Sequence, residues 1–541
     1  MLLNPGPDGP SEVIMAAFEG QVAVDLVNVF SAPKGGNVVT TLAWGDTVRV
    51  LGRSNGTLKV QLGLLTTGGD KTSVDDRVGF IRPPSKSGGF TLNDVVTKQK
   101  QDPGVLKMDF VDVQQGDAAL IETAKGRVVL VDGGDNQLFA RYLASRFPGT
   151  SDNRRKSIDC IVITHGDADH FAGLTEIHRS ESYAGINPGE ERRKRLFIQP
   201  KRIYHNGLAK RPGKKKNKST RPDKEMFGRT ATSGGKLFVT GLENDISTMS
   251  PDELNLPFQG WRTAVRAWKK NGTIEVKRLA RRLDGIPPPD AFNFLSAEGI
   301  EVEIFGPLEH RIGGKPALPF LGQPVAKAER QPGTSQVLFK GLSASHTING
   351  HSIVLRLKYG NCRILFAGDL NEESEAFLTD AHEKGELDLT AEIFKVPHHG
   401  SADFSVPFLR AVSPAVSVIS SGDESEQKEH IHPRATLVGG LSKQGRPTLD
   451  EPLILVTELA AFFKVEGWVV NDRKQVQHKT QQNTRKGEWF AFSRKAFGIV
   501  KVRTNGQRLL VFTYSGKDDM KEAYAFKLQG ERVIPEPVRK G

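Results

Sequence analysis

Three short apolar runs in the chain are each followed by side chains that can bind metal ions. The runs span residues 161–163, 364–366 and 393–396, the last interrupted by Lys395, and they are followed by His165, Asp167, Asp169 and His170, then Asp369, then His398 and His399. The runs predict buried strands, and ligands at positions i, i+2, i+4 and i+5 suit a loop at a strand end rather than one face of a helix. Such a loop can direct imidazole and carboxylate groups at two adjacent cations.

These residues also have ordinary structural interpretations. Asp167 and Asp169 could cap the helix that FAGLTEI predicts, a strand-end aspartate could be a turn residue, and two adjacent histidines could be a surface pair. The recurrence of ligands after three apolar runs favours the metal site. Because Cys160 and Cys362 are the only cysteines and both lie in apolar runs, a cysteine zinc cluster is excluded and the ligands must be histidine and carboxylate.

The positive charge of the chain is concentrated in one segment. Residues 192–224 contain 14 Lys or Arg and one acidic residue, a sum of +13, whereas the whole chain carries +12. We predict a disordered polycation that binds a phosphate backbone, with a solvated loop as the alternative. The candidate nucleic-acid-binding residues are Arg192, Arg193, Arg195, Lys214, Lys215, Lys216 and Lys218.

The apolar pattern predicts several modules in the 541 residues. Alternating apolar and polar positions with turn signals predict a small antiparallel barrel, and longer apolar strands alternating with helical stretches predict an α/β layered domain. The expected divisions are a tail over 1–19, the barrel over 20–84, a linker over 85–104, the α/β domain over 105–450 with an insertion at about 177–299, and an extension with a helix or strand and a β-hairpin over 451–541.

Six motifs of the α/β domain resemble those of the metallo-β-lactamase fold, in the family's order. They are FVDVQQGDAALIET, VVLVDGG, HGDADH, FAGD, VPHHGS and His432-Pro433, and they are most similar to the soluble domain of ComEC-type competence proteins. The resemblance implies an αββα sandwich with a two-metal hydrolytic site at one edge. Residues 20–84 in turn resemble a bacterial SH3-like domain.

The resemblance also implies how the ligands are shared between two ions. His165 and Asp167 would hold one ion, Asp169 and His170 the other, Asp369 would bridge them, and His399 or His398 would complete the set. The usual fold has a histidine at the position of Asp167, although the ComEC branch shares the aspartate. This harder ligand makes Mn²⁺ a rival to Zn²⁺.

The remaining ligand is less clear because the chain departs from the family pattern. The ComEC branch usually has Asn and Ser before the strand that starts at Ile353, where this chain has SHTINGHS. That segment looks like the His-Thr ligand motif of glyoxalase-type members with one extra residue. His346 is therefore the candidate ligand and His351 the reserve, with a polar loop that caps the strand as the alternative.

Three further residues have expected roles around the metals. Asp132 matches a family position that orients the metal loop. Asp117 could line the same edge or stabilise a turn. His432 lies where a family member offers a histidine to the leaving group, with a surface histidine as the alternative, and Asp169 is also a catalytic candidate because it anchors the ion that activates water.

We predict a soluble, cytoplasmic two-metal hydrolase, a phosphodiesterase or nuclease-like enzyme that acts on nucleic acid. Two cations that share a water lower its pKa and neutralise charge on a phosphoryl oxygen. A hydrolase of a small phosphodiester is one alternative, and a nucleic-acid or protein-binding module with a structural metal is another. The SH3-like barrel would dock a protein partner. Because the sequence has no long apolar run and no secretion-signal pattern at its start, we expect no membrane span.

Overall fold

The computed structural model describes most of the chain. The ranges are 17–54, 56–61, 65–68, 71–74, 78–83, 91–98, 103–184, 194–283, 291–324, 339–422, 432–457, 463–470, 475–478, 489–494, 498–514 and 520–541. Two candidate nucleic-acid-binding residues, Arg192 and Arg193, lie outside these ranges, as do residues 1–16. Within them, no helix is long and apolar enough to cross a membrane.

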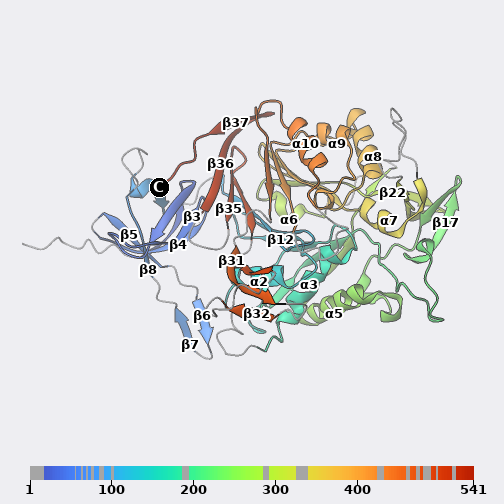
Figure 1. The fold of residues 1–541 in the computed structure, drawn as a ribbon, viewed down its shortest axis with the longest axis horizontal. Helices are drawn as coiled ribbons and strands as arrows, with labels where there is room; N and C mark the ends of the chain where they lie inside the picture. Colours follow the sequence, from blue (N-terminus) through green and yellow to red (C-terminus); the bar gives the residue numbers. More distant parts are fainter. Residues whose placement is uncertain are drawn as a thin grey trace, which may run out of the picture.

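The N-terminal module is a seven-stranded sheet, drawn in blue in Figure 1, with its own buried apolar core. Its strands, in sheet order, are β3 (Val38–Ala43), β2 (Leu26–Phe30), β8 (Val78–Ile81), β5 (Thr57–Gln61), β4 (Thr47–Ser54), β1 (Phe18–Val22) and β9 (Val96–Thr97). Helix α1 (Leu92–Val95) precedes β9, and β6 (Leu65–Gly68) pairs with β7 (Lys71–Val74). The expected linker thus contributes a helix and a strand to this module, because β9 pairs with β1.

A ten-stranded sheet forms one half of the main body. Its strands, in order, are β19 (Glu275–Arg278), β16 (Arg202–His205), β14 (Cys160–Val162), β12 (Val128–Asp132), β11 (Ala118–Glu122), β10 (Leu106–Val111), β34 (Ile499–Thr504), β35 (Arg508–Tyr514), β36 (Met520–Gln529) and β37 (Arg532–Glu536). Strands β12, β14, β16 and β19 run parallel, and the rest pair antiparallel.

A six-stranded sheet forms the other half. Its order is β21 (Ile300–Gly306), β26 (Val354–Tyr359), β27 (Cys362–Phe366), β28 (Ile393–Lys395), β29 (Val416–Ile419) and β30 (Leu453–Val456). Strands β27 to β30 run parallel. Alternate residues of a strand face opposite sides, so Ile364 and Phe366 point between the sheets while Leu365 points outward.

The two sheets pack face to face and helices cover both outer faces (Figure 1). One apolar core joins residues of both sheets. A second core lies under α2 (Leu138–Arg146), α3 (Ala168–Ser180) and α5 (Leu256–Asn271), and a third under α8 (Glu372–Glu383), α9 (Val406–Val412) and α10 (Ala435–Lys443). The mixed α/β class predicted from the sequence is confirmed.

The insertion expected over about 177–299 is in fact partly built into this body. Strands β16 and β19 extend the ten-stranded sheet, and α5 packs on α3 with Trp261 and Trp268 fully buried. Strand β15 (Ile198–Pro200) pairs with β13 (Lys156–Ile158). The expectation was wrong because these strands are short and rich in charged residues, so no long apolar run marks them.

The segments that leave the two large sheets follow β16 and β21. It contains a five-stranded sheet in the order β17 (Thr230–Ser233), β18 (Lys236–Val239), β23 (Lys315–Pro319), β22 (Leu308–Ile312) and β20 (Arg281–Arg282). Its smaller elements are η2 (Asp223–Glu225), η3 (Ile246–Thr248), η4 (Pro251–Glu253), α6 (Asn293–Ser296), β24 (Gly322–Pro324), β25 (Phe339–Leu342) and α7 (Ala344–Gly350). An apolar cluster that includes Leu208, Phe227 and Ile348 of α7 packs these elements together.

The basic segment is ordered where the structure describes it, so the expectation of a disordered core is wrong for residues 194–224. The basic loop, residues 210–224, contains eight Lys or Arg and one acidic residue. Inside it, the Lys215 N–H donates to the Ser219 carbonyl at 2.9 Å, and the Arg221 side chain donates to the Pro212 carbonyl at 2.8 Å. Leu208 before the loop and Phe227 after it are buried together, which explains how a polycation is held in place.

The expected C-terminal extension also belongs largely to the main body. Strand β30 completes the six-stranded sheet, and β34 pairs with β10 so that β34 to β37 widen the ten-stranded sheet. Three other strands form a separate small sheet, β31 (Phe463–Val470), β32 (Gln475–His478) and β33 (Trp489–Arg494). The predicted hairpin at Asn505–Gly506 is the turn between β34 and β35.

The N-terminal module is joined to the main body by an apolar contact and a buried charge. Leu26 and Trp44 pack with Leu510 and Phe512 of β35. Asp25 is fully buried, and its carboxylate lies 2.7 Å from the Arg508 guanidinium and 3.2 Å from that of Arg539.

Candidate metal centre

The ligand-bearing loops meet at one edge of the two sheets because they follow parallel strands. In the ten-stranded sheet, β12 ends at Asp132 and β14 leads to His165. In the other sheet, β27 leads to Asp369 and β28 to His398 and His399. Since the carboxyl ends of parallel strands point the same way, side chains distant in sequence converge there.

The loop after β14 turns into α3, which fixes the direction of its side chains. Asp167 is the residue before the first helical turn, and Asp169 and His170 lie within that turn. The Asp167 side chain makes no capping hydrogen bond to the helix, so the ordinary capping interpretation is not supported for this residue. His165 and His170 are completely buried, and their rings lie 4.0 Å apart.

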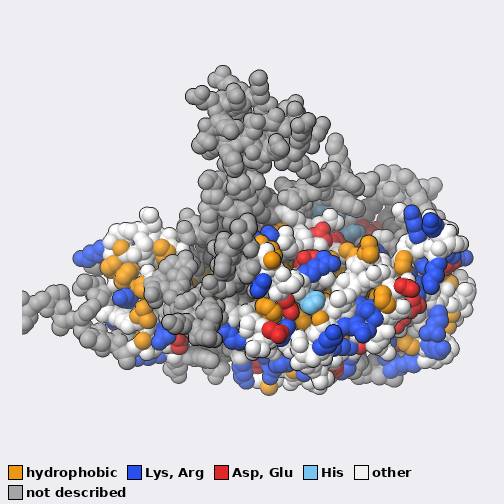
Figure 2. Space-filling view, turned by 90° about the horizontal axis from the view of Figure 1, so that it is seen from below, with side chains coloured by type: hydrophobic (Ala, Val, Ile, Leu, Met, Phe, Trp, Pro, Cys, Tyr) orange, Lys and Arg blue, Asp and Glu red, His pale blue; other side chains and the backbone are white. Residues whose placement is uncertain are grey.

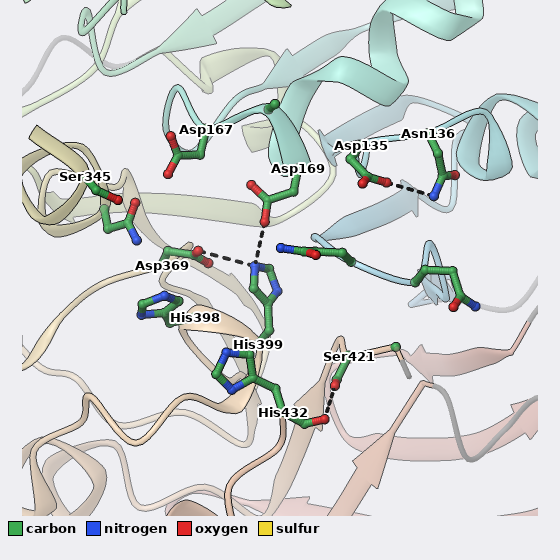
Figure 3. Close-up of a pocket in the computed structure, with 15 residues that line it drawn as sticks. Asp135, Asn136, Asp167, Asp169, Ser345, Asp369, His398, His399, Ser421 and His432 are labelled. Carbon is green, nitrogen blue, oxygen red and sulfur yellow. Dashed lines mark hydrogen bonds and ion pairs between the residues drawn. The ribbon is translucent and has the colours of Figure 1, made fainter. Parts of the chain in front are cut away.

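Histidine and carboxylate groups converge around Asp369. Its carboxylate lies 3.1 Å from Nε2 of His170, 3.3 Å from Nε2 of His399 and 3.9 Å from Nε2 of His165. Nε2 of His399 is also 3.3 Å from the carboxylate of Asp169, as the dashed lines in Figure 3 show. The structure thus brings five of the predicted ligands together.

The far side of the His170 ring is fixed by the residue predicted to orient the metal loop. Nδ1 of His170 lies 2.9 Å from the Asp132 carboxylate. Asp132 also accepts hydrogen bonds from the Thr164 N–H at 2.8 Å and the Thr164 hydroxyl at 2.7 Å. This contact leaves Nε2 of His170 directed at the cluster, as in many metal-binding histidines.

An acidic residue also faces the far side of the His399 ring. Its Nδ1 lies 3.2 Å from Asp117, whose other oxygen is 2.7 Å from the Lys395 ammonium. One ligand atom from each of Asp117, His170, Asp369 and His399 lies within 4.8 Å of the other three. Because Asp117 is occupied by His399 Nδ1 and Lys395, it orients the histidine, and Asp169 is the better fourth ligand.

The residues fit a divalent cation. Nε2 of His165, His170 and His399 and one oxygen of Asp369 are buried and satisfy no hydrogen-bond geometry. Such atoms are costly in a protein interior unless another group compensates them. Imidazole nitrogen and carboxylate oxygen are ligands for both Zn²⁺ and Mn²⁺, so the donor set admits either ion.

The charges of the cluster balance one another in the protein alone. Burial lowers the pKa of His170 and of His399, but Asp369 and the other nearby carboxylates more than offset this and hold both values well above the usual one. Burial raises the pKa of Asp369, yet His399 and His170 hold it well below its usual value. Burial keeps the pKa of His165 well below normal, which favours the neutral ring that a metal needs.

A pocket of about 470 Å³ opens onto this cluster. It is lined by Gln114, Gln115, Asp135, Asn136, Asp167, Ala168, Asp169, Ser345, Asn349, Asp369, His398, His399, Ser421, Gly422 and His432. The rings of His398 and His432 lie 6.1 Å apart, and the half-buried His432 is held through its carbonyl, which accepts a 2.7 Å hydrogen bond from Ser421 (Figure 3).

The two histidines proposed for the remaining ligand are not brought into the cluster. His346 lies 3.9 Å from Asp403, and the His351 ring lies 2.7 Å from the Pro319 carbonyl. Asn349 lines the pocket instead, and the Ser352 hydroxyl accepts the Asp369 N–H at 3.0 Å. Asn349 and Ser352 both belong to the SHTINGHS segment, from which the two histidines had been chosen instead.

Lys210 contacts a predicted ligand but was not itself predicted. The Lys210 ammonium forms an ion pair with the Asp167 carboxylate. Lys210 follows β16, the neighbour of β14 in the sheet, so the loops after these parallel strands meet. Burial raises the pKa of Asp167, and Lys210 opposes this shift. In the sequence, Lys210 is one of many cations in the basic segment, and nothing there indicates its contact with Asp167.

The comparisons with known proteins agree with part of this picture. Residues 111–240 match the family model of the metallo-beta-lactamase superfamily, which supports the metallo-β-lactamase fold for this part of the chain. Together with the cluster of histidines and aspartates, the match indicates a metal-dependent hydrolase. No curated protein matches the chain.

Two solved structures give weak alignments. The proteins NlpC2 and NlpC1 from Trichomonas vaginalis are 13% and 14% identical, over 32% of this chain and 71% and 67% of theirs, each with a TM-score of 0.11. Alignments this poor say nothing about the fold of the chain. The resemblances to ComEC-type and SH3-like domains stay predictions.

Proposed function

We propose that this chain hydrolyses phosphodiester bonds in nucleic acid with the help of divalent metal, Zn²⁺ or Mn²⁺, as a relative of the ComEC-type domains. Asp169, His170, Asp369 and His399 would hold metal. A bound divalent ion lowers the pKa of a coordinated water and neutralises charge on a phosphoryl oxygen. His432 lines the pocket, with its ring 6.1 Å from that of His398, and would assist the leaving oxygen.

The observation that carries the nucleic-acid proposal is the position of the basic loop. At its start, Lys210 contacts Asp167, and at its end, Asp223 accepts a 2.8 Å hydrogen bond from the N–H of Ala344 at the start of α7. Asp167 and residues of α7 line the pocket. Both ends of a loop with eight cations are therefore attached to the wall of the candidate active site.

The exposed part of the loop suits a phosphate backbone. Lys214, Lys216 and Lys218 are exposed, whereas Lys215 is 2.7 Å from Glu225. The Arg195 side chain donates to the Tyr183 carbonyl at 2.7 Å, so it is partly engaged within the fold. Figure 2 shows the molecule from below, with Lys and Arg side chains spread among acidic ones. Non-specific binding through phosphates fits the three exposed lysines of the loop.

A small phosphodiester is the second candidate substrate. The pocket volume of about 470 Å³ lies within the range of small-ligand sites. In that case the basic loop would not take part in catalysis. The N-terminal sheet, which has its own apolar core, would act as the SH3-like module and dock a protein partner in either case.

The two candidates differ in how they depend on the basic loop. The test compares hydrolysis of single-stranded DNA and of bis(4-nitrophenyl) phosphate, each with Mn²⁺ and with Zn²⁺. We expect replacement of Lys214, Lys215, Lys216 and Lys218 by Gln to slow only the DNA reaction. The matched control replaces four other exposed lysines by Gln, namely Lys270, Lys315, Lys384 and Lys443. DNA turnover that is equal in both variants would favour the small substrate, and no turnover of either substrate would contradict the proposal.

A further inference from the structure

Lys210 is held firmly against a residue that the resemblance assigns to a metal. The Lys210 carbonyl accepts a 3.0 Å hydrogen bond from the Asn255 N–H, and the preceding Ala209 is buried. Arg211, the next residue, pairs with Glu253 at 2.8 Å. The side chains of Lys210 and Asp167 are only 21% and 20% exposed. A fixed backbone therefore presents the ammonium to the carboxylate.

The Asp167 side of the cluster has few other ligands to offer a second ion. His165 lies near Asp369, His398 lines the pocket beside Asp369 with a buried Nδ1 that has no hydrogen-bond partner among the described residues, and Asn349, which also lines the pocket, offers a neutral amide. A neutral amide oxygen binds a divalent ion more weakly than imidazole or carboxylate does. With Asp167 paired to Lys210, the ligands left for a second ion are His165, His398 and Asp369, and the one carboxylate among them is shared with the first ion.

The carboxylates of the site divide into two groups by their partners. Asp117 faces Lys395 and Asp167 faces Lys210, so a lysine balances each of them. Asp169 and Asp369 face histidines instead. Once those histidines are neutral ligands, Asp169 and Asp369 carry two negative charges beside the ion, which one divalent ion balances, while Asp132 faces the far nitrogen of His170.

We infer that Lys210 takes the place of a second metal ion, so that the site binds one divalent ion among Asp169, His170, Asp369 and His399. This inference rests on the metal site of the proposed function and concerns its stoichiometry. The ammonium supplies the positive charge next to Asp167 that the second ion of a two-metal site would supply. A second divalent ion would have to displace it against electrostatic repulsion.

The test measures bound metal per chain. The full-length protein is stripped with a chelator, reloaded with excess Zn²⁺ and freed of unbound ion by gel filtration, and its metal content is then measured by mass spectrometry. We expect one ion per chain in the parent and two in Lys210→Met, which frees Asp167. The Asp167→Asn variant should still hold one ion. If the parent instead held two ions, this substitution would remove one of them.

A matched control and a second readout make the result specific. Lys201 forms an ion pair with Asp159 at 2.9 Å just before β14, at the other end of that strand, so Lys201→Met should keep one ion. After loading with Mn²⁺, electron paramagnetic resonance should show isolated ions in the parent and exchange-coupled ions in Lys210→Met.

Each contrary result has a distinct meaning. Two ions in the parent, or one ion in Lys210→Met, would overturn the inference. Hydrolysis of bis(4-nitrophenyl) phosphate is measured on the same samples. A parent that holds one ion but hydrolyses no diester would contradict the proposed function and leave the stoichiometry standing.

Discussion

At the scale of single residues, Asp169 and His170 are the side chains on which the metal centre most depends. Their replacement by Ala should remove bound metal and lower phosphodiesterase activity by about 10²-fold, because each anchors the ion that activates water. The measurements are metal content and initial rates, with circular dichroism as the control for folding. Full turnover by variants that have lost their metal would contradict metal-assisted hydrolysis.

His432 has a different expected signature. If its ring donates a proton to the leaving oxygen, His432→Ala should lower kcat by about 10²-fold or more for a poor leaving group and much less for nitrophenolate, which leaves without help. Metal content should not change. An equal loss on both substrates would assign His432 to binding or folding instead.

The sequence predicts the ligands better than it predicts their surroundings. His165, Asp169, His170, Asp369 and His399 could be recognised because each follows a strand, and strand ends meet at one edge. A contact such as that of Lys210 with Asp167 depends on the path of a loop that leaves a neighbouring strand, and no spacing encodes it. His346 was proposed from a motif match, and the structure turns it toward Asp403.

At the scale of elements, the basic loop gives a quantitative prediction. Each phosphate contact by a cation contributes about −0.9 to the slope of log K against log salt for duplex DNA. Replacing Lys214, Lys215, Lys216 and Lys218 by Gln should flatten the slope by about three, because Lys215 is already paired with Glu225 while the other three are exposed. Fluorescence anisotropy at several salt concentrations measures the slope. An unchanged slope would show that the loop makes no phosphate contacts.

Elements with long apolar runs were predictable, and short or distant ones were not. Strand β12 reads VVLVD and is buried along its whole length, so its sequence alone indicates a strand. Strand β16 reads RIYH, and only its parallel neighbours β14 and β19 make it part of the sheet. The pairing of β10 with β34 joins segments about 390 residues apart, and a local pattern carries no information on such a partner.

At the scale of the whole molecule, Asp25 links the N-terminal module to the main body. Asp25→Ala should lower the free energy of unfolding by about 3 kcal/mol, because it removes the buried carboxylate that Arg508 and Arg539 share and leaves Arg508 with Glu536 as its remaining partner. Urea unfolding followed by tryptophan fluorescence measures the loss. Asp380→Ala removes an exposed pair with Lys384 and should have little effect. Equal stability of the two variants would show that the buried charge does not hold the module in place.

The pairing of β10 with β34 also sets an order of events during synthesis. When the ribosome has made β10, β11 and β12, the strand that completes the ten-stranded sheet on the other side of β10 does not yet exist. Until residues 499–504 emerge, the nascent chain carries an open strand edge of the kind that aggregates with other chains. We therefore expect chaperones to bind the nascent chain late in translation, before residues 499–504 emerge and after the candidate metal-binding residues have been made.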